Sequence, residues 1–87
     1  MFYVYILLSL KDQRFHVGST KDLKRRFSEH QSGAVESTRH RRPLYLLGYE
    51  AYQRLDEAVV RERYLKSSDA RKEFRVRFAK SLCEFNA

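Results

Sequence analysis

The chain alternates between apolar runs whose neighbouring side chains would point to opposite faces and segments whose apolar residues recur every three or four positions. The first pattern predicts strands and the second predicts helices. The strand pattern puts Tyr3 and Tyr5 on one face of the first strand, and His16 and Gly18 on one face of the next. The predicted elements are strands over residues 2–9, 14–19 and 44–52, helices over residues 20–31 and 55–66, and a last helix from about residue 69.

The first predicted helix carries signals at both ends. Thr20 suits its N-cap, and Asp22 suits its first turn, where a carboxylate interacts favourably with the helix dipole. Gly33 is expected to end it. The polar loop that follows, residues 32–43, is long for so small a domain, and such loops are more often functional than idle.

The order β-β-α-β-α-α predicts an α+β fold in which a small three-stranded antiparallel sheet is flanked by helices. The 87 residues suffice for a single domain, 1–87, with one modest core. Hydrophobic residues make up 43% and charged residues 33%, which favours a globular chain over a disordered one. The single cysteine, Cys83, excludes an internal disulfide and a cysteine-rich zinc site.

The apolar start of the chain is too short to span a bilayer and lacks the basic segment and cleavage site of a signal peptide. We therefore expect a cytoplasmic protein without a membrane segment. Lys and Arg total 18 against 11 acidic residues, a net charge of +7. This excess favours a polyanionic partner, first nucleic acid and second an anionic membrane surface. Charge alone does not decide between a binding protein and a protein that is simply basic.

Two helices carry a charge on the stripe that should face the core. Arg26 lies between Leu23 and Phe27, and Glu62 lies on the stripe of the next helix. That second stripe consists of Leu55, Ala58, Val59, Glu62 and Leu65. A buried charge is costly unless it is paired or holds a metal. The two charges could form a buried ion pair, or the stripe edge could reach solvent. Alternatively, Arg26 could bind a phosphate and Glu62 a hard cation.

Other polar and aromatic residues have a structural and a functional interpretation. His30 lies one turn after Arg26 on the same helical face, and His16 lies on the preceding strand, so each could be a core histidine or part of a site. The histidines do not have the spacing of zinc ligands. Tyr5 could be a core residue or could present its hydroxyl to a site. The basic run of residues 39–42 could be a solvated loop or a contact to a nucleic-acid backbone.

Together these residues resemble the GIY-YIG nuclease family. Tyr3-Val4-Tyr5 and His16-Val17-Gly18 stand at its two strand motifs, and Arg26 and His30 follow at the family's spacing. Glu62, within Arg61-Glu62-Arg63-Tyr64-Leu65-Lys66-Ser67, matches the family's metal-binding glutamate. Over about residues 2–80 the chain is similar to the short, single-domain bacterial subfamily, which is related to the N-terminal domain of the excision-repair incision subunit. In this chain Tyr3 replaces a motif glycine and His16 replaces the tyrosine that is a candidate general base.

The resemblance implies a metal-dependent endonuclease that acts on nucleic acid, with DNA expected, in repair, recombination or processing. It implies one divalent cation, Mg²⁺ or Mn²⁺, held by Glu62 as the metal ligand. The expected catalytic residues are Tyr5, His16, Arg26, His30 and Glu62, and the expected nucleic-acid-binding residues are Lys21, Arg25, Arg39, Arg41 and Arg42. Arg26 would stabilise charge on the phosphate, and Tyr5 would orient the water or the phosphate.

His16 could replace the motif tyrosine as the base, because a neutral imidazole is abundant near pH 7. Two other functions stay open. The chain could be a basic nucleic-acid-binding module with a degenerate site, although binding alone has little use for an inward carboxylate such as Glu62. It could also be a structural or protein-interaction domain whose basic charge is incidental.

Overall fold

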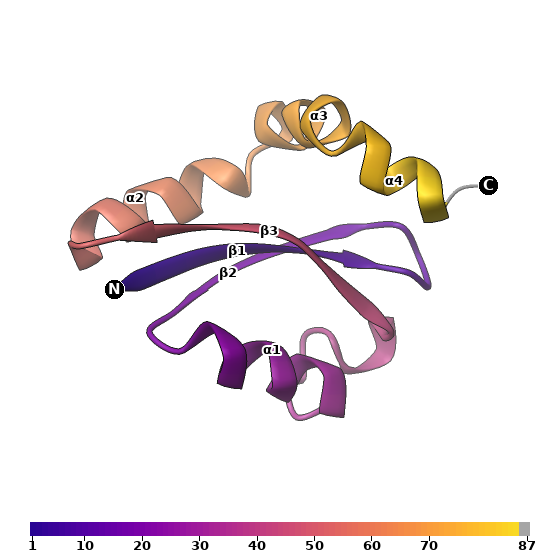
Figure 1. Cartoon of the computed structure of the whole chain (residues 1–87), viewed down its shortest axis with the longest axis horizontal. Helices are drawn as coiled ribbons and strands as arrows, with labels where there is room; N and C mark the ends of the chain where they lie inside the picture. The colour runs from indigo at the N-terminus through magenta and orange to yellow at the C-terminus, as the bar shows by residue number, and fades with distance from the viewer. Residues whose placement is uncertain (86–87) are drawn as a thin grey trace.

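A three-stranded antiparallel sheet lies between two helical layers in the computed structural model, which describes residues 1–85 (Figure 1). The strands are β1 (Phe2–Ser9), β2 (Phe15–Thr20) and β3 (Leu44–Tyr52). Their order in the sheet is β2-β1-β3, so β1 is central and β2 and β3 are edge strands. The central position explains the apolar composition of β1, since its residues are covered on both faces.

One helix covers one face of the sheet and the later helices cover the other (Figure 1). The helical elements are α1 (Leu23–Ser32), the 3-10 turn η1 (Arg39–Arg41), α2 (Leu55–Leu65), α3 (Ser68–Arg77) and α4 (Ala79–Phe85). The α+β class and the antiparallel sheet are confirmed. The predicted last helix is two helices, because Phe78 leaves the helical path at φ −105° and ψ 22°. This bend lets α4 follow the sheet, where Phe85 packs on Tyr45.

The two faces of the sheet have separate cores, and the predicted alternation is confirmed in β1 and β2. Val4 and Ile6 pack with Val17 against α2 and α3, around the fully buried Phe74. Tyr5 and Leu7 point to the other face and pack with Leu44, Leu23 and Phe27 under α1. Tyr5 and its neighbours therefore lie in a layer different from that of α2.

Several local predictions need correction. Asp22, not Thr20, is the N-cap of α1, because its carboxylate accepts a hydrogen bond from the Arg25 amide at 3.1 Å. The expected stripe of α2 is also partly wrong, since Leu55 and Val59 are 55% and 39% exposed. Helix α2 is rotated so that its small Ala58 lies against the sheet and is 1% exposed.

Other local predictions are confirmed. Gly33 ends α1 with a left-handed φ of 86°. The predicted third strand is also found, and it carries a bulge at Gly48, because Ile6 pairs with Gly48 whereas Leu7 pairs with Leu46. Within residues 1–85, none of the helices combines the length and apolar character needed to cross a bilayer.

Candidate active site

The predicted catalytic residues gather around the edge strand β2. His16 and Gly18 point from this strand toward the α1 layer, whereas Ser19 points toward α2 and donates a hydrogen bond to Glu62 at 2.6 Å. Because β2 has no neighbour on its outer side, residues of both helical layers can approach one another around it. Arg26 comes from α1 and Glu62 from α2.

A buried chain of hydrogen bonds fixes the tyrosine of the first motif. The Tyr5 hydroxyl lies 2.9 Å from His30 Nε2, and His30 Nδ1 lies 2.7 Å from the Thr38 hydroxyl. His30 is fully buried, and its burial, with the nearby charge of Arg26, lowers its pKa. A neutral imidazole donates through one nitrogen and accepts through the other, so both are occupied here. His30 therefore positions Tyr5 and has no ring nitrogen free for a substrate.

The Tyr5 hydroxyl stays protonated and lies beside Arg26. Burial raises the pKa of Tyr5, and the nearby guanidinium of Arg26 opposes this only in part. The Tyr5 hydroxyl and Glu29 in turn raise the pKa of Arg26. Arg26 Nη1 lies 3.2 Å from Glu29 Oε1, and the Arg26 side chain is 39% exposed. Since a guanidinium has five N–H donors, Arg26 keeps donors for a phosphate.

Gly18, the glycine of the second motif, leaves space for the ring of Tyr5 in the first motif. Gly18 pairs with Tyr5 across the two strands. A Cβ added at Gly18 would collide with the Tyr5 hydroxyl and lie only 2.6 Å from Tyr5 Cζ. The ring of Tyr5 therefore crosses directly over the backbone of Gly18, and no larger residue fits without moving it.

We expect Gly18→Ala to displace the Tyr5 ring from His30. The variant should be about 1–3 kcal/mol less stable, the usual cost of an overpacked core, and should lose most of any catalytic activity. Urea unfolding and a nuclease assay at a temperature where the variant is folded would measure both effects. Gly48→Ala is the control, because the added Cβ would lie 3.3 Å from the edge of the Phe78 ring, in the core on the other face of the sheet from the Tyr5 side chain. Full activity in Gly18→Ala would contradict the role assigned to this tyrosine.

His16 lies beside this pair with its ring centroid 5.1 Å from that of His30 and 6.4 Å from that of Tyr5. Burial first, then the neighbouring His30, and then the positive charges of Arg41 and other basic groups lower the pKa of His16 to about 4. The imidazole is therefore neutral at pH 7, and it is a weaker base than an exposed histidine.

Glu62 is ionised and partly exposed. Its carboxylate accepts hydrogen bonds from Ser19 at 2.6 Å and from Lys66 Nζ at 2.9 Å. Burial raises its pKa, but these two contacts and the nearby His16 outweigh that effect and hold the pKa below its usual range. The side chain is 20% exposed. Arg26 and Glu62 do not form the buried ion pair that was one alternative, since Arg26 pairs with Glu29 and Glu62 with Lys66. Both side chains are partly exposed, so the edge of each helical stripe reaches solvent.

The donors around Glu62 fit a loosely held hard cation rather than a closed metal cage. Nowhere in the described part of the chain do three His, Cys, Asp or Glu side chains come together as metal ligands. Mg²⁺ needs only one or two carboxylates and takes its other ligands from water and phosphate oxygens. Glu62 could hold such an ion, with the Ser19 hydroxyl as its neighbour. Lys66 would then have to move away from the carboxylate.

The predicted nucleic-acid-binding residues do not form one surface. Lys21 and Arg25 line a hollow of about 400 Å³ together with Arg26, so they flank the site on the α1 side. Arg41 and Arg42 diverge, although they are adjacent in sequence. Arg41 bonds to Asp12 at 3.1 Å, whereas Arg42 donates to the backbone carbonyls of Gln31, near the end of α1, and of Arg39 in η1. Arg39 is exposed on η1.

Three residues of the site did not emerge from the sequence. Ser19 and Thr38 are uncharged and have no local pattern that marks them, and each acquires its role only through a partner distant in the chain. Lys66 lies four residues after Glu62, and that helical spacing was a usable signal for an ion pair.

Comparisons with known proteins show the family to which the chain belongs. The model of the GIY-YIG catalytic domain matches residues 1–75. A UPF0213 protein of Clostridium perfringens is 34% identical over 99% of this chain and 92% of its own length. A UPF0213 protein of Haloquadratum walsbyi is 36% identical over 75% of this chain and 73% of its own.

A solved structure supports the same assignment. The solution structure of the UPF0213 protein BH0048 from Bacillus halodurans has a TM-score of 0.54 and 35% identity, covering 85% of this chain and 82% of that one. These relatives, together with the two strand motifs, Arg26 and Glu62 around one strand edge, lead to one assignment. The chain belongs to the GIY-YIG family and is similar to its small UPF0213 proteins.

Proposed function

We propose that this protein is a metal-dependent endonuclease that hydrolyses phosphodiester bonds, with DNA as the expected substrate. The observation that carries the proposal is electrostatic. The buried Tyr5 hydroxyl lies within the influence of both Arg26 from one helical layer and Glu62 from the other. Arg26 from α1 offers a cationic fork for a phosphate, and Glu62 from α2 offers a carboxylate for a divalent cation.

The residues of the candidate active site would have separate roles. Arg26 would bind non-bridging phosphate oxygens and stabilise the charge that builds on them. Tyr5, held by His30, would donate its hydroxyl hydrogen bond to the phosphate or to the attacking water. His16 would accept the proton that this water loses as its oxygen bonds to phosphorus and the bond to the leaving oxygen breaks. Held by Glu62, Mg²⁺ or Mn²⁺ would supply positive charge for the transition state and the leaving oxygen.

The first test is cleavage of labelled single-stranded, duplex and branched DNA with Mg²⁺ or Mn²⁺, and with EDTA. Cleavage that requires the metal would support the nuclease and rank its substrates. Binding without cleavage on every substrate would favour the alternative, a basic nucleic-acid-binding module with a degenerate site. A lone site cuts one strand, so we expect nicks rather than double-strand breaks in a duplex. We expect it to act in repair, recombination or processing in the cytoplasm.

The role of His16 can be tested through the pH dependence of cleavage. Because His16 has a pKa of about 4, its base form persists far below neutral pH. We expect the wild type to retain activity at about pH 5.5, and His16→Tyr to shift the acidic limb upward, since a tyrosine hydroxyl has a pKa near 10 in water. His16→Ala should lose about 10²-fold or more in rate. An unchanged pH profile in His16→Tyr with full activity in His16→Ala would refute the role.

A further inference from the structure

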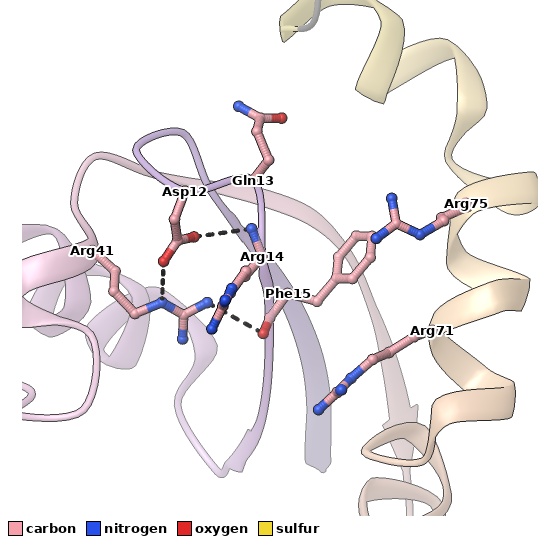
Figure 2. A pocket seen from close by; sticks show the side chains of 7 residues that line it. All are labelled: Asp12, Gln13, Arg14, Phe15, Arg41, Arg71 and Arg75. Atoms are coloured by element: carbon pink, nitrogen blue, oxygen red, sulfur yellow. Dashed lines mark hydrogen bonds and ion pairs between the residues drawn. The ribbon is translucent and has the colours of Figure 1, made fainter.

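A second basic site lies beside the turn between β1 and β2. A hollow of about 460 Å³ opens there between this turn, the segment of η1 and helix α3. Figure 2 shows Arg71 and Arg75 extending from α3 toward the turn, opposite Arg41. Four arginines line what we call the arginine hollow, namely Arg14, Arg41, Arg71 and Arg75. Three of them were not among the residues predicted to bind nucleic acid.

Most of the positive charge in the arginine hollow has no carboxylate partner. Asp12 is the acidic residue of its lining, and both of its oxygens are occupied, by Arg41 Nε at 3.1 Å and the Arg14 backbone amide at 2.9 Å (Figure 2). Within residues 1–85, no carboxylate pairs with the guanidinium groups of Arg14, Arg71 or Arg75.

Several arginines elsewhere in the molecule are neutralised by nearby acids, such as Arg61 by Glu50 at 2.9 Å and Arg54 by Asp56 at 2.9 Å. The other arginines without a carboxylate partner within residues 1–85 do not line this hollow, namely Arg39, Arg42 and Arg63. Three free guanidinium groups around one concave surface repel one another, and a bound anion would relieve that repulsion. The concentration of unpaired arginine in the hollow therefore marks it as a site for an anion rather than as an ordinary solvated face.

The arginine hollow continues into the candidate active site. A neighbouring hollow of about 270 Å³ is lined by His16 and Lys66 and also by Arg71. Arg71 thus belongs to both hollows, and Lys66 bonds to Glu62 at 2.9 Å. A polyanion bound at Arg26 and at the cation that Glu62 would hold can therefore pass Lys66 and Arg71 and enter the arginine hollow along basic side chains.

We propose that the arginine hollow binds backbone phosphates that neighbour the scissile phosphate on the same nucleic-acid strand. This inference rests on the proposed function, because it extends that same site. The contact is to phosphate rather than to a base, since the ring of Phe15 is already covered by the Arg75 guanidinium, 5.7 Å from its centroid. Arginine forks that bind phosphates do not read the base sequence. At the arginine hollow the strand is therefore held by its backbone, and this contact adds no sequence preference.

The test is the salt dependence of DNA binding by Arg71→Gln/Arg75→Gln, measured by fluorescence anisotropy in EDTA so that no cleavage occurs. Removing two phosphate contacts lowers the slope of log affinity against log salt by about 1.4 for a single strand and about 1.8 for a duplex. Between about 50 and 200 mM salt the wild type should then lose about tenfold more affinity than the variant. Lys72→Gln/Lys80→Gln is the charge-matched control, with two exposed lysines of α3 and α4 that do not line the hollow.

A second measurement locates the contact along the strand. Neutral methylphosphonate links, placed one at a time on each side of the preferred cleavage position, should weaken wild-type binding at one or two positions. The same links should leave binding by the double variant unchanged. Equal salt slopes in the wild type and in the hollow variant would overturn the inference even if cleavage is robust. A smaller salt slope in the hollow variant, together with no cleavage by the wild type, would support phosphate binding at the arginine hollow and would refute the proposed nuclease activity.

Discussion

Glu62→Gln is expected to lower the rate of metal-dependent cleavage by about 10³-fold, equivalent to about 4 kcal/mol, because it removes the carboxylate proposed to hold the cation. Glutamine keeps the volume of the side chain and can still accept the hydrogen bond from Ser19. DNA binding should be equal or tighter, since a negative charge next to the phosphates is lost. Single-turnover cleavage and anisotropy binding would separate the two effects.

The control for this prediction is Glu57→Gln, which makes the same change on the same helix. The Glu57 side chain is 64% exposed and pairs with Arg54 rather than with the site. The Glu57→Gln variant should cleave DNA at the wild-type rate. The free energy of unfolding of Glu62→Gln should differ from that of the wild type by less than about 1 kcal/mol, since the ion pair between Glu62 and Lys66 is partly exposed. Cleavage by Glu62→Gln within a few-fold of the wild type would refute the assignment of this residue as the metal ligand.

Acidification from about pH 6.5 to about pH 4 is expected to destabilise the fold through His16. The pKa of His16 is about 4 in the folded protein and near 6.5 in an unfolded chain, so the unfolded state binds more protons throughout this range. The free energy of unfolding should fall by about 1.4 kcal/mol for each pH unit while one proton separates the two states. The total is about 3 kcal/mol at most, and the partial exposure of the ring reduces it.

Urea unfolding in EDTA at about pH 7.5, 6.5, 5.5 and 5 would measure this loss. The range above pH 5 isolates the histidines, because carboxylates with lowered pKa values, such as Glu50 and Glu62, lose their stabilisation only at lower pH. In His16→Gln the free energy of unfolding should depend less steeply on pH than in the wild type. The pH dependence that is left would come from His30, whose pKa is also lowered. Parallel curves for the wild type and His16→Gln would show that His16 is not held neutral by the fold.

The sequence was sufficient for the architecture because local patterns carry that information. The alternation in residues 2–9 and 14–19 correctly separated the two faces of the hairpin, and Gly33 correctly ended α1. Local patterns were insufficient where packing decides orientation. Leu55 and Val59 are exposed because the side of α2 that contacts the sheet is chosen by the small Ala58 rather than by the largest apolar residues. The end of α3 at Phe78 likewise follows from how the chain lies on the sheet.

For the site, the sequence by itself determined which chemical groups are present. Arg26 and Glu62 stood out because charge is costly on an inward stripe, and His16 stood out because it replaces a motif tyrosine. Tertiary structure alone decided how these groups act. It buries His30 between Tyr5 and Thr38, which uses both ring nitrogens. It also buries much of His16 and places basic groups near its ring, and both effects lower the pKa of His16 to about 4. These effects depend on distances between residues far apart in the chain, which spacing along the sequence does not contain.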